Sequence, residues 1–308
     1  MKIRFLLLSA IILLTIFITG CNQTQSTATP DIPPGTTDIT NQTEVTTDPV
    51  VTQTAEPTPS VPLIATVNGE GIWLSDFEAD VQRYLVAADN LKKEVDEIQA
   101  KQIVLDTMIE TILLAQGARE MGYGLDQEMY SKKIEQLILD SGGESQFQQW
   151  LSDNNYSQEE FERIYKLQLE AVWFRDQIIS QTPTRAEQIR ARQILVSSKS
   201  LADNIHNDLE NGAKFDYYSW GYDQLSGGEL GWFPRDYLIL PEIEAAVFDL
   251  QPGEFTDVIQ STYGFHIVQV MERDLDRPLT QDALLQKQRI VLASWLSEKK
   301  AGSTIILH

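Results

Sequence analysis

The chain has 308 residues, with 45 acidic and 24 basic side chains and a formal net charge of -21. Such an excess of negative charge disfavours nucleic-acid binding and offers no basic patch for anionic lipids. The sequence contains one cysteine, which excludes an intramolecular disulfide framework and a CxxC redox site. The length is sufficient for two modest domains after a processed N-terminal segment.

The first 21 residues have the pattern of a secretory signal. Two basic residues precede an apolar run at residues 5–18, which is shorter than the roughly 20 residues that a membrane-spanning helix needs. The segment closes on Ile-Thr-Gly-Cys at 18–21, which resembles a bacterial lipobox. We therefore expect a signal peptide at 1–20 and a lipid on Cys21; the alternative is an uncleaved signal anchor.

Residues 22–61 contain no Lys or Arg and are rich in Thr, Pro, Gln, Asp and Asn. Such a composition buries too little apolar surface to offset the entropy cost of ordering the chain. The sequence therefore predicts a disordered tether at 21–61, beginning at the lipidated cysteine and leading away from a membrane.

Residues 62–183 have the pattern of a mainly helical domain. A strand at 63–67 ends on the turn signal Asn68-Gly69, and Ser75 is the expected N-cap of a helix. Helical spacing of apolar residues predicts further helices at about 90–117, 126–141, 145–153 and 157–180. The run Ala65–Ile72 followed by a helix resembles the start of the chaperone domain of SurA-like and PrsA-like foldases; the alternative is an unrelated helical bundle.

The pattern becomes α+β in the next part of the chain. We expect a strand at 190–196, a helix from Ser200 to about 211, strands at 227–235, 255–260 and 263–270, and a helix at 241–249. Five motifs occur in this region, namely A-R-x-I-L-V at 191–196, G-G-x-L-G-W-F at 227–233, P-E-x-E-x-A-x-F at 241–248, P-G-E at 252–254 and Y-G-F-H-I-V-x-V at 263–270.

These motifs, in this order, resemble the parvulin family of peptidyl-prolyl isomerases in its PrsA and SurA form. The resemblance implies a parvulin domain at 188–274, built as a strand, three helices, a strand, a helix and two strands. This domain would be inserted in, or would follow, the helical SurA- and PrsA-like domain. It would need neither metal nor cofactor, because rotation about a prolyl bond breaks no covalent bond.

The resemblance also implies a site. Its second histidine would be His266, and the rim of the last strand would carry Ser261 and Tyr263. The apolar proline pocket would include Leu238 or Ile239, Ile243 and Phe248.

Two positions depart from the family pattern. Gln193 stands where the first histidine is expected; it can keep a hydrogen bond to His266 but cannot titrate. The family's Cys or Asp falls in a shortened loop, where Asp223 is one acidic match and Gly221 aligns about as well, which would leave the site without an acid. The same loop carries an aromatic cluster, namely Tyr217, Tyr218, Trp220 and Tyr222.

The tail at 277–308 predicts a helix that begins at Thr280 or Asp282 and ends before Gly302, followed by a short strand. In the foldase families this segment returns to the helical domain. We therefore expect residues 304–307 to pair near 64–67.

The first hypothesis is a foldase anchored to the outer side of the cell membrane, with prolyl isomerase activity on unfolded or nascent exported polypeptides. The second is a holdase chaperone whose parvulin domain has lost turnover, as Gln193 would favour. A third hypothesis, a solute-binding lipoprotein, would need two α/β lobes with parallel strands, and the strand pattern supplies none. The oligomeric state is left open.

Overall fold

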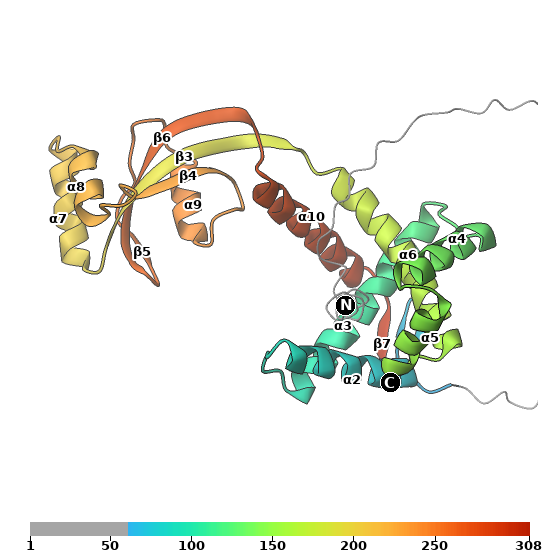
Figure 1. Cartoon of the computed structure of the whole chain (residues 1–308). Coiled ribbons are helices and arrows are strands. Elements are labelled where there is room, and N and C mark those ends of the chain that lie inside the picture. The colour runs from blue at the N-terminus through green and yellow to red at the C-terminus, as the bar shows by residue number, and fades with distance from the viewer. Residues whose placement is uncertain (1–60) are drawn as a thin grey trace, which may run out of the picture. The chain divides into compact units, whose positions relative to one another are not determined.

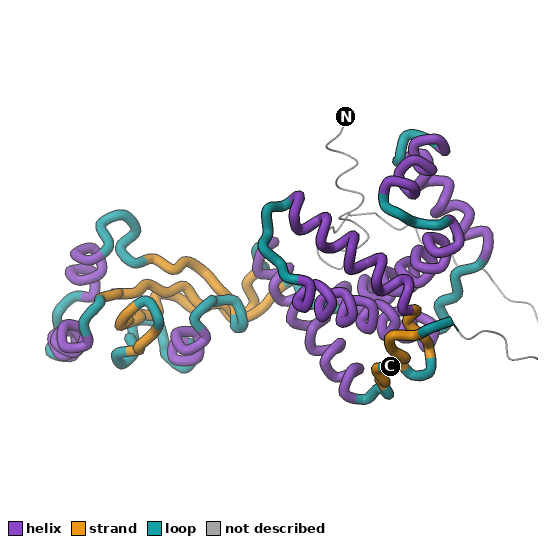
Figure 2. The backbone as a smooth tube through the Cα atoms, turned by 90° about the horizontal axis from the view of Figure 1, so that it is seen from below, coloured by secondary structure: helices purple, strands orange, loops and turns teal. Residues whose placement is uncertain are grey.

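The computed structural model describes residues 61–308 (Figures 1 and 2). The predicted signal peptide, Cys21 and tether lie outside these described residues, apart from residue 61. The described chain divides into two compact units. Unit 1 comprises residues 61–112, 125–168 and 304–308, and unit 2 comprises residues 113–124 and 169–303.

Unit 1 contains a three-stranded antiparallel sheet. Its strands β1 (Leu63–Val67), β2 (Glu70–Trp73) and β7 (Ile305–Leu307) lie in the order β2-β1-β7. Asn68 and Gly69 make the β1–β2 turn with φ of 52° and 87°, the left-handed conformation that two-residue hairpin turns require. The pairing expected between residues 304–307 and 64–67 is present, with Ala65 opposite Leu307 and Val67 opposite Ile305.

Helices supply the rest of unit 1, and two of them, α3 and α6, continue into unit 2. Their bounds are α2 Leu74–Asn90, α3 Glu97–Glu120, α4 Gln127–Asp140, α5 Glu144–Asp153 and α6 Gln158–Ser180. Asp126 caps α4 by accepting a hydrogen bond from the Met129 N–H. The prediction of Ser75 as an N-cap was wrong, because α2 follows β2 directly and starts at Leu74.

Unit 2 is built on a four-stranded antiparallel sheet. Its strands are β3 (Arg185–Val196), β4 (Glu229–Pro234), β5 (Ile259–Ser261) and β6 (Gly264–Pro278), in the order β4-β3-β6-β5. Helices α7 (Lys199–Glu210) and α8 (Phe215–Tyr222) cover one face of the sheet, and α9 (Pro241–Val247) covers the other (Figure 1). The remaining helix, α10 (Gln281–Ala301), is capped by Thr280, the first of the two starts that the sequence predicts.

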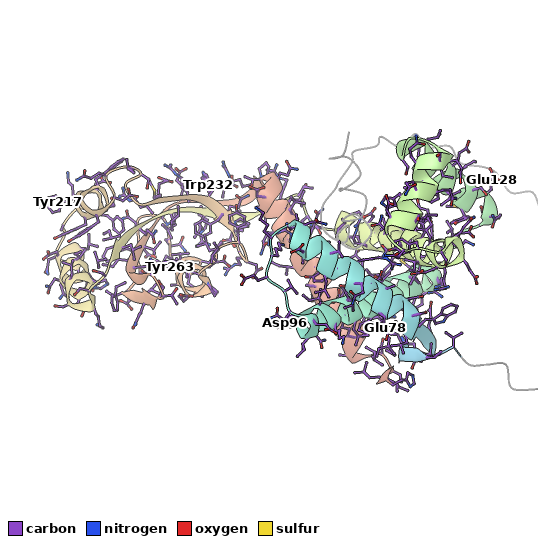
Figure 3. The ribbon with its side chains drawn as sticks, turned by 60° about the horizontal axis from the view of Figure 1, so that its bottom comes forward. Glu78, Asp96, Glu128, Tyr217, Trp232 and Tyr263 are labelled. Carbon is purple, nitrogen blue, oxygen red and sulfur yellow. The ribbon has the colours of Figure 1, made fainter. Side chains whose placement is uncertain are left out.

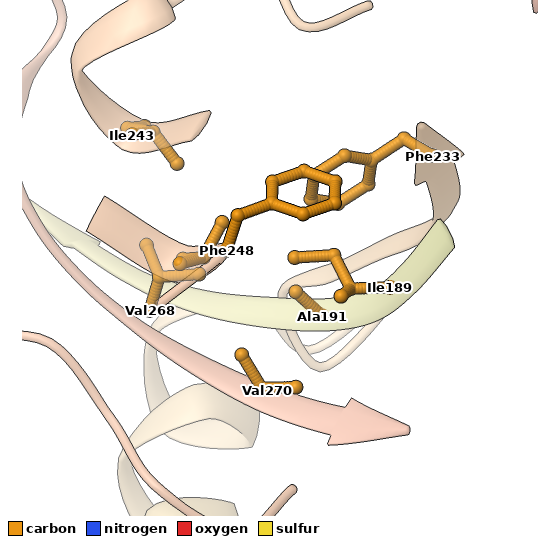
Figure 4. Close-up of a cluster of buried hydrophobic side chains, with 8 residues drawn as sticks. Ile189, Ala191, Phe233, Ile243, Phe248, Val268 and Val270 are labelled. Carbon is orange, nitrogen blue, oxygen red and sulfur yellow. The ribbon is translucent and has the colours of Figure 1, made fainter. Parts of the chain in front are cut away.

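Successive side chains of a strand point to opposite faces of the sheet, and buried apolar residues form a hydrophobic core on each face. On the α9 face, buried residues from four elements form one cluster (Figure 4), namely Ile189, Ala191, Phe233, Ile243, Val247, Phe248, Val268 and Val270. On the other face, Ile194, Val196 and Ile267 pack against α7 and Phe215. Gln193 and His266 follow the alternation of the α9 face, so the fold directs both toward one side.

Two expected elements of unit 2 differ from the structure. The segment with the aromatic cluster is not a loop: residues 215–222 form α8, because Phe215 and Ser219 are buried against the sheet while Tyr217 stays exposed. The strand expected at 255–260 shortens to β5, with Phe255 making a single bridge to Gln269.

Candidate functional site

His266 occupies β6 between two strands. Leu195 of β3 and Ile259 of β5 are its direct cross-strand neighbours. Its ring bonds instead to the diagonal neighbours on the same face, two residues along each strand: Nδ1 lies 2.8 Å from Gln193 Oε1, and Nε2 lies 2.6 Å from Ser261 Oγ. Both ring nitrogens of His266 are therefore hydrogen-bonded within the protein.

These contacts define one protonation state. The Gln193 carbonyl oxygen can only accept, so His266 Nδ1 carries the proton and Nε2 accepts from the Ser261 hydroxyl. Ser261 Oγ in turn accepts a hydrogen bond from the Tyr263 N–H at 3.0 Å. Burial lowers the pKa of His266, whose side chain is 1% exposed, although the nearby Glu242 carboxylate acts in the opposite direction. His266 is thus a neutral imidazole at pH 7.

A pocket of about 690 Å³ lies beside Gln193 and His266. Apolar side chains dominate its wall. The residues that line it are Gln193, Leu195, Leu230, Tyr237, Leu238, Ile239, Leu240, Ile243, Tyr263, His266, Asp282, Leu285, Gln286 and Arg289. Its size and its lining of apolar side chains around a small polar group suit a single side chain or a short peptide segment.

The structure brings together most of the pocket residues expected from the sequence. Leu238, Ile239, Ile243 and Tyr263 all line the pocket. Ile243 is buried, whereas Ile239 is 90% exposed and Tyr263 69% exposed, which places these two at the rim. In Figure 3, Tyr263 lies at the turn between β5 and β6, away from Tyr217 on α8.

Three expected site residues do not line the pocket. Ser261 acts behind the wall through its hydrogen bond to His266 Nε2. Phe248 is 2% exposed and packs edge-on against Phe233 in the core, so it supports the pocket from beneath instead of touching its contents. Asp223 follows α8, and its carboxylate accepts hydrogen bonds from the residues of the turn that comes next.

The carboxylate of Asp223 accepts hydrogen bonds from the Leu225 and Ser226 N–H groups and from the Ser226 hydroxyl, with a longer one from Gly228 N–H. These bonds, the hydroxyl's first, lower the pKa of Asp223 to about 2. An anion held this way stabilises the turn before β4. The alternative, Gly221, is a residue of α8 with open space around it.

Gly228 determines where Gln193 lies. The Gln193 N–H donates to the Gly228 carbonyl at 2.8 Å. A Cβ on Gly228 would stand 1.9 Å from the Gln193 carbonyl oxygen, and its φ is 73°. Only glycine permits this approach, so the Gly-Gly motif at 227–228 positions the partner of His266.

Sequence reasoning missed one wall of the pocket. Four of its lining residues come from α10, and the two outer ones are Asp282 and Arg289. The spacing of the four, i, i+3, i+4 and i+7, marks one face of a helix, but nothing in the sequence alone indicates what that face meets.

Within unit 2, the four-stranded antiparallel sheet with helices on both faces and a histidine facing an apolar pocket have the arrangement expected of a parvulin-type domain. Residues 178–274 match the PPIC-type PPIASE domain family, and residues 45–172 match the SurA-like N-terminal domain family. Two parts of the chain therefore match the models of two domain families, a SurA-like N-terminal domain followed by a PPIC-type domain.

Individual relatives carry the names of foldases and chaperones. The chain is 33% identical to the foldase protein PrsA of Bacillus subtilis over 108 residues, which are 32% of this chain and 37% of that protein. It is 33% identical to the chaperone SurA of Thiobacillus denitrificans over 135 residues, 41% of this chain and 29% of that one. The chain thus spans well under two thirds of the length of these first relatives.

Two further comparisons cover more of the chain. The foldase protein PrsA of Caldanaerobacter subterraneus is 26% identical over 239 residues, 67% of this chain and 72% of that protein. Among solved structures, the peptidylprolyl isomerase PrsA of Bacillus anthracis is 24% identical, covers 64% of this chain and 97% of its own, and has a TM-score of 0.43. Within residues 61–308, no helix combines the length and hydropathy that crossing a membrane requires.

Proposed function

We propose that unit 2 is a peptidyl-prolyl cis-trans isomerase whose proline pocket is the cavity beside His266. The observation that carries this proposal is the hydrogen-bonded row Gln193–His266–Ser261 at the base of an apolar pocket that includes Leu238 and Ile243. A proline ring has the size and polarity for such a pocket, residues 178–274 match the PPIC-type PPIASE domain family, and the chain is similar to relatives named PrsA and SurA.

The chemistry needs no nucleophile. The planar amide owes its barrier of about 18–20 kcal/mol to conjugation, which also makes it more polar than the twisted form. Moving the X-Pro bond from water into an apolar pocket therefore favours the twisted transition state over the planar ground state. His266 has both nitrogens occupied, so its role here is to hold Gln193 and Ser261 in place and to keep water from the floor of the pocket.

A protease-coupled assay on a proline tetrapeptide tests this proposal. We expect residues 61–308 to accelerate isomerisation, and His266→Ala to reduce kcat/KM by at least tenfold, because the variant opens the floor of the pocket to water. Tyr217→Ala, which alters an exposed residue of α8, should keep the full rate. A wild-type rate equal to the uncatalysed one would end the enzyme proposal.

A second candidate function, a holdase without turnover, is favoured by one observation. Gln193 replaces a titratable residue, and His266 has no ring nitrogen free to contact a substrate. If the holdase alternative is right, the same protein suppresses aggregation of an unfolded client although it shows no isomerase rate, and His266→Ala leaves the suppression unchanged.

We further propose that the protein acts outside the cytoplasm, anchored by a lipid on Cys21, on unfolded or nascent exported polypeptides. The lipobox-like segment at 18–21 and the relatives named as foldases and chaperones support this location and substrate. In this organisation a tether at 21–61 precedes a chaperone domain at 62–183, a parvulin domain at 188–274 and a returning tail at 277–308. Cys21→Ala should move the protein from the membrane fraction to the soluble fraction in cells that process the wild type.

A further inference from the structure

One wall of the pocket is built by a helix that follows the isomerase domain. The match to the PPIC-type domain ends at residue 274, whereas α10 begins at Gln281. Asp282, Leu285, Gln286 and Arg289 of α10 nonetheless line the same cavity as His266. The wall is therefore an addition of this chain to the domain that would perform the isomerisation.

Contacts within unit 2 hold the first half of α10 against this cavity. The Leu279 N–H donates to the Thr184 carbonyl at 2.9 Å, just before β3 begins. Lys287 Nζ donates to the Arg235 carbonyl at 3.1 Å, in the segment that leads to the pocket residues 237–240. Ala283, on the first turn of α10, is only 2% exposed. The wall is thus tied at two points to the elements that carry the rest of the pocket.

The two charged side chains of this wall, Asp282 and Arg289, have different surroundings. Asp282 lies in the first turn of α10, where the unpaired N–H groups of a helix stabilise an anion. Arg289 lies two turns further on and is exposed. No carboxylate of residues 61–308 comes within ion-pair distance of it, although the chain has 45 acidic side chains and 24 basic ones. Arg289 is the only basic residue among those that line the pocket.

A negatively charged substrate side chain would be favoured at the α10 wall of the pocket and disfavoured near His266. Near His266, the Glu242 carboxylate of α9 is close enough to affect the histidine electrostatically, so a second anion there would be repelled. At the α10 wall, the guanidinium of Arg289 offers up to five donors in a planar fork that matches a carboxylate. A peptide with its proline near Ile243 would therefore gain most from an acidic side chain directed toward α10.

We propose that α10 is a specificity wall of the isomerase pocket and that Arg289 selects segments in which an acidic residue neighbours the proline. This inference rests on the proposed isomerase function and names its preferred substrate class. It assigns to Arg289 a direct contact with substrate, and to Asp282 the opposite effect, repulsion of the same acidic side chain.

The test compares kcat/KM for matched peptides that carry Glu, Gln or Lys either directly before or directly after the proline. For at least one of the two positions, we expect the wild type to favour Glu over Gln by about two- to fivefold, the range that one solvent-exposed ion pair supports. Raising the salt concentration to about 1 M should reduce this ratio toward one, because exposed charges are then screened. Arg289→Gln should bring the ratio of kcat/KM for the Glu and Gln peptides close to one.

Lys300→Gln is the matched control, because it removes the same charge from the last turn of α10, outside the pocket. It should keep the preference for Glu, and Asp282→Asn should increase it. Equal ratios in wild type and Arg289→Gln, for both peptide positions, would overturn the inference while leaving the isomerase proposal intact. A wild type inactive on every peptide would instead mean that the proposed function itself has failed.

Discussion

At the scale of single residues, the site depends on a histidine that stays neutral. Nδ1 of His266 donates to Gln193 and Nε2 accepts from Ser261, so a second proton would require the Ser261 hydroxyl to turn away. Burial already disfavours the imidazolium and lowers the pKa of His266. In the unfolded chain the same histidine titrates near its usual value of about 6.5.

This difference makes His266 a source of pH-dependent stability. Below pH 6.5 His266 binds a proton in the unfolded chain but stays neutral in the folded chain. Its contribution to the free energy of unfolding is therefore complete above that pH and is lost as pH falls toward the folded pKa. We expect the free energy of unfolding to decline between pH 7.5 and pH 5 more steeply in the wild type than in His266→Gln, measured by urea denaturation. Parallel slopes would contradict the assignment.

A second prediction at this scale concerns the partner of His266. Gln193→Glu places a carboxylate 2.8 Å from His266 Nδ1 and should raise the pKa of the histidine, because an adjacent negative charge stabilises the imidazolium. A pH titration of the His266 ring protons by NMR measures this, with His206 and His308 as internal references. Gln260→Glu adds the same charge at an exposed position of β5 and should shift the pKa of His266 much less.

At the scale of elements, the close approach of β4 to β3 sets the position of Gln193. Gly228→Ala should destabilise the protein by more than about 3 kcal/mol, because the new Cβ would overlap the Gln193 carbonyl and one strand end would have to move. Gly231→Ala is the matched control: its φ is 74°, but its Cβ meets open space, so only the conformational cost of about 1–2 kcal/mol applies. Similar losses in thermal unfolding of the two variants would show that the close approach does not matter.

Most elements could be predicted from the sequence because their signals are local. Asp126 and Thr280 are side-chain caps at the start of periodic segments, and Asn68-Gly69 fits one turn type. Helix α8 was not predicted, because its run of aromatic residues has weak helix propensity. Its helical conformation depends on packing against the sheet. The α10 wall and the core position of Phe248 depend on tertiary contacts, which no local pattern records.

At the scale of the whole molecule, the last residues complete a sheet that the first described residues begin. The Asn68 N–H donates to the Thr304 carbonyl at 2.8 Å, and the His308 N–H donates to the Ile64 carbonyl at 3.0 Å. Strand β7 thereby covers one edge of β1 in unit 1.

Removing residues 304–308 should therefore destabilise unit 1 selectively, since each lost backbone hydrogen bond contributes about 0.5–1.5 kcal/mol. Hydrogen exchange of the β1 amides at Ala65–Val67 should accelerate, while the NMR signals of His266 in unit 2 stay unchanged. Leu307→Thr alters an exposed side chain but keeps the strand, and should leave the exchange rates near those of the wild type. Unchanged exchange in the truncated chain would argue against a stabilising role for β7.

The pairing of β7 with β1 also determines the order in which the two units can complete their folding during synthesis. As the chain emerges from its N-terminus, β1 and β2 are complete early, but the edge of β1 waits until nearly the whole chain has followed. At synthesis rates of about 5–20 residues per second, this wait is roughly 10–50 s. Unit 2 has all its strands before then, so it can fold while unit 1 is still open. The delay matches the tens of seconds that an uncatalysed prolyl bond takes to isomerise.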